Sequence, residues 1–252
     1  MQAATETNNN TMQNYCKTIG ALAAASALVA GNASAEVEYE IHTGYSTEYL
    51  FRGLDSGHNL VEAGVDVKTE LNGLGLSAGA WYGSFASPRG GNADGSELDV
   101  YGEVSKDFGF VTGAIGYISY QNLRNLGEDS QEVYFSLSKE LFYGVKASLT
   151  YFWEIEDVGS GTGGYLEAKV GKGFELSPCL TLNTGATLGY LLEENDFAQL
   201  TTKVSLDWAF TETATLSPYI AASWGLTNDR RSNLYSNVGQ ELLGGVSLSV
   251  KF

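Results

Sequence analysis

Alternation of apolar and polar residues dominates this chain and is clearest at its carboxyl terminus. After Leu242, the apolar residues Val246, Leu248, Val250 and Phe252 alternate with small or polar ones. Because successive side chains of a strand point to opposite faces, this period of two predicts a β-strand with one apolar face.

About twelve such segments follow one another, each near the roughly 9–11 residues that a tilted membrane strand requires. The connections alternate in length: Asn72-Gly73 is tight, whereas Gly53–Asn59, Ser84–Ser96 and Leu226–Gln240 are long. This alternation is expected when short periplasmic turns close one barrel end and extracellular loops close the other. The segments cover residues 37–49, 61–71, 74–85, 97–107, 110–120, 131–141, 144–154, 164–174, 180–191, 197–210, 214–225 and 241–252.

Lysines indicate which face of each segment is polar. A lysine facing lipid near the bilayer midplane costs roughly 2–4 kcal/mol. Lys68, Lys146, Lys169 and Lys203 all lie opposite the apolar residues of their segments. The pattern predicts an all-β fold, a transmembrane antiparallel up-and-down β-barrel of about twelve strands with both termini in the periplasm.

Aromatic residues gather near the ends of the predicted strands, at both ends of the barrel. Two such belts are typical of the girdles that outer-membrane barrels place at the two membrane interfaces. The belt near the short turns contains Phe108, Phe110, Phe142, Tyr143, Phe174, Phe210 and Phe252, and the belt near the long loops contains Tyr45, Tyr49, Tyr82, Tyr117, Tyr151, Trp153, Tyr190 and Trp224.

The first 35 residues carry an export signal. A polar stretch with Lys17 precedes an apolar run from Ile19 to Ala30, and Ala33-Ser34-Ala35 supplies a small-residue cleavage site. We therefore predict a signal peptide over residues 1–35, with residues 1–11 as an upstream extension, and a barrel over residues 36–252. Export combined with a terminal aromatic strand predicts the outer membrane of a Gram-negative cell envelope, with Phe252 as an assembly signal.

Charge and cysteine content narrow the partners. The chain has 30 acidic and 14 basic residues and a net charge of −16, which argues against nucleic acid and anionic lipid as partners. Cleavage would leave Cys179 alone, so no internal disulfide is expected. The expected partners are outer-membrane lipid, lipopolysaccharide, the barrel-assembly machinery and small solutes, and no cofactor is expected.

One motif suggests a family. Thr47-Glu48-Tyr49-Leu50-Phe51-Arg52-Gly53 resembles the Ser/Thr-acid-Tyr-x-Phe-Arg-Gly signature of the TorF-type porins. Gly75-Leu76-Ser77-Ala78-Gly79-Ala80-Trp81 is similar to the second signature of that family. The resemblance implies an outer-membrane barrel and, for the family, an inferred role in transport. From its position, Arg52 would lie near the outer rim, where it either pairs with a carboxylate of the wall or contributes to a constriction.

Ionisable residues on the polar faces are the candidate lumen lining. Acids outnumber bases among them, which favours cations in a hydrated lumen, although salt-bridged side chains could also close it. Strand spacing and tilt give a backbone radius of about 12 Å, so that side chains leave a narrow channel or none. With Arg52, the candidates are Glu38, Glu40, Glu62, Asp66, Lys68, Glu70, Asp99, Glu103, Glu132, Lys146, Glu154, Glu167, Lys169 and Lys203.

Catalytic and metal sites have little support. The chain has two histidines, of which His42 is expected to face inward and His58 to lie in the first loop with Asp55 and Ser56. This spacing is ordinary for a polar loop, so we expect neither an enzyme nor a metal centre.

The sequence thus predicts a narrow, cation-preferring outer-membrane pore for passive diffusion of small hydrophilic solutes. The alternative is a closed structural or adhesive barrel that acts through Ser84–Ser96, Tyr120–Ser130 and Leu226–Gln240.

Overall fold

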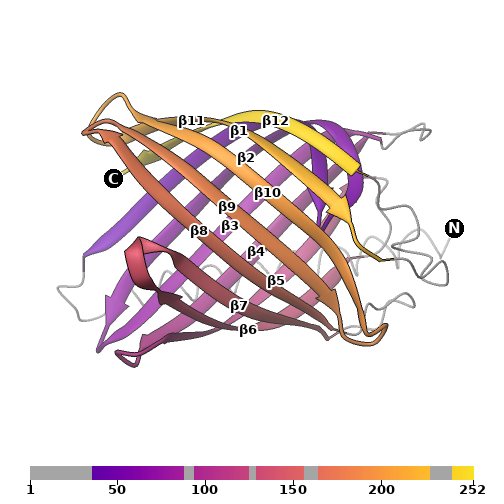
Figure 1. The fold of residues 1–252 in the computed structure, drawn as a ribbon, viewed down its shortest axis with the longest axis horizontal. Coiled ribbons are helices and arrows are strands. Elements are labelled where there is room, and N and C mark those ends of the chain that lie inside the picture. The colour runs from indigo at the N-terminus through magenta and orange to yellow at the C-terminus, as the bar shows by residue number, and fades with distance from the viewer. Residues whose placement is uncertain (1–35, 88–93, 125–128, 156–163, 228–239) are drawn as a thin grey trace, which may run out of the picture.

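The computed structural model describes residues 36–87, 94–124, 129–155, 164–227 and 240–252, which form a closed antiparallel barrel (Figure 1). Each strand pairs with its neighbours in sequence, and β1 pairs with β12 to close the barrel. The strands are β1 (Val37–Phe51), β2 (Leu54–Leu71), β3 (Leu74–Ala86), β4 (Gly95–Asp107), β5 (Thr112–Arg124), β6 (Ser130–Glu140), β7 (Lys146–Glu154), β8 (Tyr165–Ser177), β9 (Leu180–Leu191), β10 (Asp196–Ala209), β11 (Ala214–Gly225) and β12 (Gln240–Lys251). The prediction of a twelve-stranded all-β barrel is confirmed.

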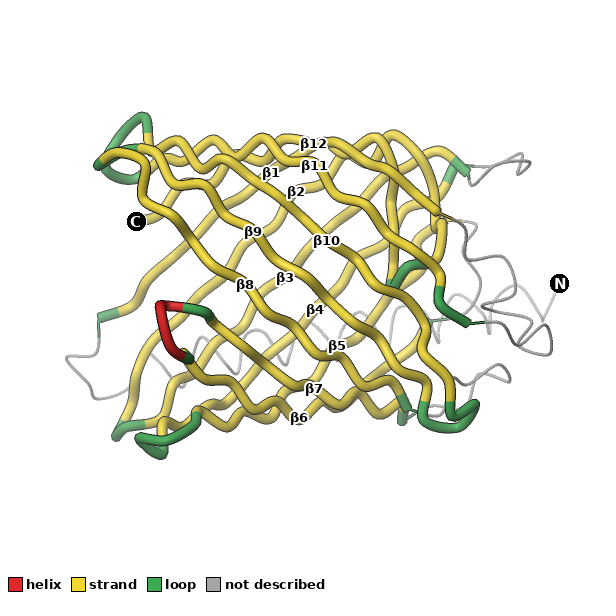
Figure 2. The backbone as a smooth tube through the Cα atoms, in the orientation of Figure 1, coloured by secondary structure: helices red, strands yellow, loops and turns green. Residues whose placement is uncertain are grey.

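One end of the barrel, here the turn end, carries the short connections (Figure 2). They include Asn72-Gly73 between β2 and β3 and the single helical turn Phe142–Gly144 between β6 and β7. The chain terminus lies at the same end, where the backbone N–H of Phe252 donates to the carbonyl of Tyr39 at 2.9 Å and the N–H of Tyr39 donates back at 3.3 Å. These two bonds extend the β1–β12 seam to the last residue.

The outer face of the barrel is apolar. Ile41 is paired with Val65 on β2 and with Val250 on β12, so one band of apolar side chains runs across the closing seam. Ile41 is 53% exposed and Ile220 on β11 is 62% exposed. Apolar residues exposed at alternate positions around a closed barrel are typical of a lipid-facing surface.

The other end, here the loop end, departs from the sequence prediction at its first connection. Residues 53–59 do not form a loop, because β1 continues to Phe51 and β2 begins at Leu54. Arg52 and Gly53 form a two-residue turn with φ angles of 51° and 83°. Positive φ at both central positions is the requirement of a tight hairpin turn, and a register shift between Tyr49 and Leu50 interrupts the pairing below it. Polar residues lie on both faces of this hairpin, so its sequence lacks the alternation of apolar and polar residues that predicts a strand.

Two further observations complete the fold. No helix among the described residues is long and apolar enough to cross a membrane. The predicted export signal, residues 1–35, lies outside the described residues.

Candidate functional site: a hairpin across the lumen

The tip of the β1–β2 hairpin reaches the far wall of the barrel. Arg52 donates from Nη1 and Nη2 to the two carboxylate oxygens of Glu132 on β6, at 2.8 and 2.7 Å. The side chains are only 9% and 8% exposed. A bidentate arginine–carboxylate pair is among the stronger polar contacts in proteins, and burial keeps water from competing with it.

Aromatic rings surround the same guanidinium. The Cζ atom of Arg52 lies 4.8 Å from the ring centroid of Phe51, 4.6 Å from that of Phe152 on β7 and 4.4 Å from that of Tyr165 on β8. Each distance is within the range of a cation–π interaction. Arg52 is therefore held by β6, β7 and β8 together.

The rest of the tip packs against further strands. A Cβ added to Gly53 would lie 2.7 Å from the side chain of Gln199 on β10, so the turn backbone sits directly against that residue. Leu54 packs against the buried cluster of Tyr165, Leu191 and Ala198. Because β1 and β2 pair only with β12, β3 and each other, these contacts with β6 to β10 require the hairpin to cross the interior of the barrel.

Tyr49 anchors the hairpin on its own side of the lumen. Its ring lies 4.7 Å from that of Phe85 and 5.8 Å from that of Trp81, both on β3. Its hydroxyl donates to Glu97 on β4 at 2.7 Å. The prediction that Tyr49 belongs to the interfacial belt is therefore wrong: the register shift beside it turns this side chain inward.

Carboxylates of β2 to β6 accept hydrogen bonds from aromatic side chains. Asp66 accepts from the Tyr101 hydroxyl at 2.8 Å, and Glu103 accepts from Tyr134 at 2.9 Å. Each tyrosine reaches its carboxylate by passing over a glycine of the strand between them. A Cβ at Gly79 on β3 would collide with the Tyr101 ring, and a Cβ at Gly116 on β5 would collide with the Tyr134 ring. Glu62 likewise accepts from Trp81 Nε1 at 2.7 Å.

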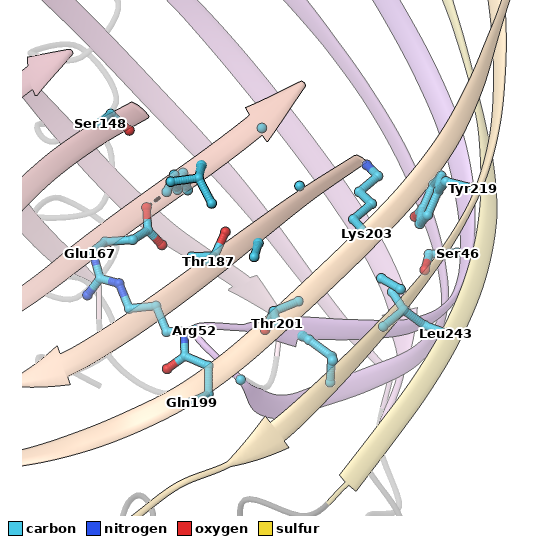
Figure 3. Close-up of a pocket in the computed structure, with 18 of the residues that line it drawn as sticks. Ser46, Arg52, Ser148, Glu167, Thr187, Gln199, Thr201, Lys203, Tyr219 and Leu243 are labelled. Carbon is cyan, nitrogen blue, oxygen red and sulfur yellow. Dashed lines mark ion pairs between the residues drawn. The ribbon is translucent and has the colours of Figure 1, made fainter. Parts of the chain in front are cut away.

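A cavity of about 800 Å³ lies between the hairpin and the opposite wall. Side chains of nearly every strand line it, including Glu48, Tyr49 and Arg52 of the hairpin. Figure 3 shows Arg52 beside Gln199, with Lys203 farther along the same strand as Gln199. The cavity is therefore an internal chamber, lined by charged, hydroxyl-bearing and apolar side chains, that the hairpin bounds on one side.

The predicted lumen residues are spread around the barrel wall, apart from Arg52, which lies in the turn between β1 and β2. Ion pairs join Glu40 to Lys251 at 3.7 Å and Glu167 to Lys169 at 2.6 Å. The structure brings six candidates to the cavity, namely Arg52, Glu62, Lys146, Glu167, Lys169 and Lys203. The others lie elsewhere along the wall, namely Glu38 and Glu40 on β1, Asp66, Lys68 and Glu70 on β2, Asp99 and Glu103 on β4, Glu132 on β6 and Glu154 on β7.

Glu48, Asp55 and His58 form a cluster at the base of the hairpin. One potential ligand atom from each residue lies within 4.8 Å of the others, and His58 Nδ1 contacts Glu48. One imidazole and two carboxylates could hold a divalent ion. The cluster is equally explained as an ion pair between neighbouring strands, since Glu48 and His58 are paired in the β1–β2 register.

The uncharged partners of the hairpin tip were not predicted from the sequence. Gln199 and Tyr165 are uncharged, and neither belongs to a motif. Both are nevertheless almost completely buried, at 2% and 1% exposed.

Comparison with known proteins gives a family and a fold. The sequence model of a family described as "Bacterial protein of unknown function (Gcw_chp)" matches residues 30–244. A search of curated proteins found no match.

Three solved structures illustrate the shared fold. The COG4313 outer membrane channel from Pseudomonas putida F1 is similar with a TM-score of 0.56 and 11% identity, over 86% of this chain and 95% of that one. The NanC porin gives 0.52 and 13% over 85% and 100% of the two chains. The KdgM porin gives 0.51 and 13% over 84% and 99%. At these identities the likeness establishes the barrel architecture, and the similarity to TorF-type porins stays a resemblance of two motifs.

Proposed function

The chain belongs to the Gcw_chp family of bacterial proteins, whose function is unknown, and we propose that it is an outer-membrane channel for passive diffusion of small hydrophilic solutes. The cavity of about 800 Å³ inside a barrel with an apolar outer face carries the proposal. Charged side chains inside the barrel have no role in lipid contact, but they can hold hydrated solutes. The channel and porin folds of the similar structures support the same function.

The hairpin makes this channel narrow. Its tip spans the lumen from β2 to the strands opposite, where Arg52 is bound to Glu132. Solutes must therefore pass beside the tip, or the tip must move. In this proposal the turn end faces the periplasm and the loop end faces the outside, as is general for bacterial barrels.

Cation preference is the electrostatic part of the proposal. Inward carboxylates outnumber inward lysines along the wall, and a net negative lumen raises the local concentration of cations. Carboxylates of β2 to β6 accept hydrogen bonds from tyrosine and tryptophan and still have acceptor sites to spare for a cation.

Planar-bilayer recording of the refolded protein tests the proposal. We expect small conductance steps, and a reversal potential in a KCl gradient that indicates cation selectivity. Replacing Arg52 with alanine should enlarge the steps by loosening the tip. The channel proposal fails if neither the wild type nor this variant conducts at any pH or voltage, whereas anion selectivity would overturn only its electrostatic part.

The second candidate function is a closed structural or adhesive barrel. The buried Arg52–Glu132 pair favours it, because a firmly bound tip would seal the lumen permanently. Deletions in the long loops between β3 and β4, β5 and β6, or β11 and β12 should then abolish binding to a partner surface without affecting the barrel. Conductance of the wild type distinguishes the two functions.

A further inference from the structure

Three lysines converge on one wall of the cavity. Lys146 on β7, Lys169 on β8 and Lys203 on β10 all line it. The Lys146 side chain makes no hydrogen bond, ion pair or ring contact with the part of the chain that the structure describes. Lys169 is paired with Glu167 but remains 54% exposed, and Lys203 Nζ lies 4.0 Å from the ring centroid of Tyr219. All three ammonium groups can therefore still bind a solute.

The carboxylates that line the cavity are less available than these lysines. Glu62 accepts from Trp81, Glu167 is paired with Lys169, and Glu48 contacts His58. Such contacts fix the carboxylates in the wall. The excess of acidic residues raises the concentration of small cations throughout the lumen. The side chains that are free to bind a solute in the cavity, by contrast, are lysines.

Strand register creates a trough between two of the lysines. Lys146 is paired with Gly171, Gly171 with Gly185, and Gly185 with Lys203, so that the four residues form one row across β7 to β10. A Cβ at either glycine would meet only backbone atoms, at 3.3 Å or more. Gly79, by contrast, is covered by Tyr101. The trough is thus free of side chains and has a positive charge on each side.

Polar groups continue the trough toward the hairpin. Ser148, Thr187 and Thr201 supply hydroxyl groups to the cavity wall, and Figure 3 shows Thr187 and Thr201 facing the same space as Lys203. Gln199 is 2% exposed and donates to the Tyr165 hydroxyl at 2.6 Å. Its Oε1 has no hydrogen-bond partner within the described ranges. An anionic solute has no donor for this oxygen, so the lysines and the hydroxyl groups are the groups of this wall that can bind an anion.

We propose that this wall of β7 to β10 is a binding subsite for a small organic acid with two carboxylates. Lys146 and Lys203 are three strand spacings apart, about 14 Å between Cα atoms along the wall, so their flexible side chains can each take one end of a short dianion. The open glycine row leaves room for its carbon chain. The subsite rests on the proposed channel function, since it names the class of solute that the lumen would select.

Isothermal titration of the refolded full chain in detergent tests the subsite with succinate as the probe and succinamide as its neutral counterpart. Succinate should bind and succinamide should not. Lys146→Gln and Lys203→Gln should each weaken succinate binding roughly tenfold, the loss expected for one charge-assisted hydrogen bond. Raising the salt concentration should weaken binding further.

Lys172→Gln is the matched control, because Lys172 is next to Gly171 but on the outer face, with its Nζ 4.9 Å from the Phe174 ring centroid. It should bind succinate like the wild type, and retarded migration of unheated samples in detergent gels will establish that every variant is folded. Equal binding of succinate and succinamide, unchanged affinity in both lysine variants, or tighter binding of inorganic phosphate than of succinate would overturn the subsite.

Conductance measurements distinguish failure of the proposed subsite from failure of the proposed channel. Cation-selective steps without succinate binding would refute the subsite and leave the channel proposal intact. Succinate binding by a barrel that never conducts would support the subsite as a binding site and refute the channel.

Discussion

At the scale of single residues, Arg52 determines how the lumen is occupied. Its sequence context places it near the outer rim, where the first predicted strand ends, but its partner Glu132 is 80 residues away, and no local pattern links the two. The guanidinium loses its hydration and gains a bidentate pair with Glu132 and contacts with three aromatic rings. Such a site tolerates neither a neutral residue nor a lysine, because an ammonium group cannot form the two parallel hydrogen bonds.

Arg52→Ala should lower the free energy of unfolding by about 3–5 kcal/mol, because it leaves the Glu132 carboxylate buried and unpaired. Arg52→Lys should cost less, about 1.5–3 kcal/mol, the value of one hydrogen bond to a charged group. Denaturant unfolding followed by tryptophan fluorescence measures both. The double variant Arg52→Ala with Glu132→Ala is the control and should recover part of the loss. Wild-type stability of Arg52→Ala would mean that the pair does not form in the membrane.

At the scale of elements, two hairpin turns with the same backbone have different surroundings. Arg52-Gly53 and Asn72-Gly73 both combine a positive-φ residue with glycine, at φ of 83° and 74° for the two glycines. Gly53 touches Gln199, whereas nothing lies within 4 Å of a Cβ at Gly73. The sequence predicts a tight turn at Asn72-Gly73 and a long loop after Arg52, whereas the structure has a tight turn at both places and packs only the Arg52-Gly53 turn against another strand.

Gly53→Ala and Gly73→Ala form a matched pair. Both replace glycine in the left-handed region, at a cost of roughly 1–2 kcal/mol. Gly53→Ala should lose about 1–3 kcal/mol more, because its methyl group is forced into Gln199. It should also enlarge the conductance steps, whereas Gly73→Ala should not. Equal unfolding curves for the two variants would indicate that the hairpin tip is not seated on β10.

The closing strand gives a second prediction at this scale. Deleting Phe252 removes two backbone bonds with Tyr39 and an aromatic side chain that is 70% exposed at the turn end. We expect a several-fold decrease in assembled barrel in the outer-membrane fraction of a Gram-negative host, with unchanged conductance of the molecules that do insert. Phe252→Tyr, which keeps the ring, is the control and should assemble normally. Normal insertion of the truncated chain would contradict the role of Phe252 as an assembly signal.

At the scale of the whole molecule, the barrel separates an apolar outside from a polar inside, and neighbouring residues therefore tolerate charge very differently. Leu149 is 45% exposed on the outer face of β7, and Ser148 beside it lines the cavity. Leu149→Lys should destabilise the membrane-inserted barrel by roughly 2–4 kcal/mol, whereas Ser148→Lys should be nearly neutral. Refolding into lipid vesicles at graded denaturant concentrations measures both. Equal costs would contradict a lipid-facing outer surface.

The sequence by itself determined the barrel: the strand number, the inward position of the lysines and the tight turns at one end. Strand alternation and turn chemistry are local properties, so each segment carries its own evidence. Of the two alternatives that the sequence left open for Arg52, the structure shows the pairing with a wall carboxylate, Glu132. The sequence could not show that residues 54–59 form a paired strand.

Only the tertiary structure decided what fills the lumen. The hairpin crosses it because Arg52, Gly53 and Leu54 find partners on β6, β8, β9 and β10, which become neighbours only when β1 pairs with β12. The lysine row has the same origin, since Lys146 and Lys203 face one trough through the register of four strands. Alternation specifies the face on which a side chain lies, whereas closure and register specify what it meets there.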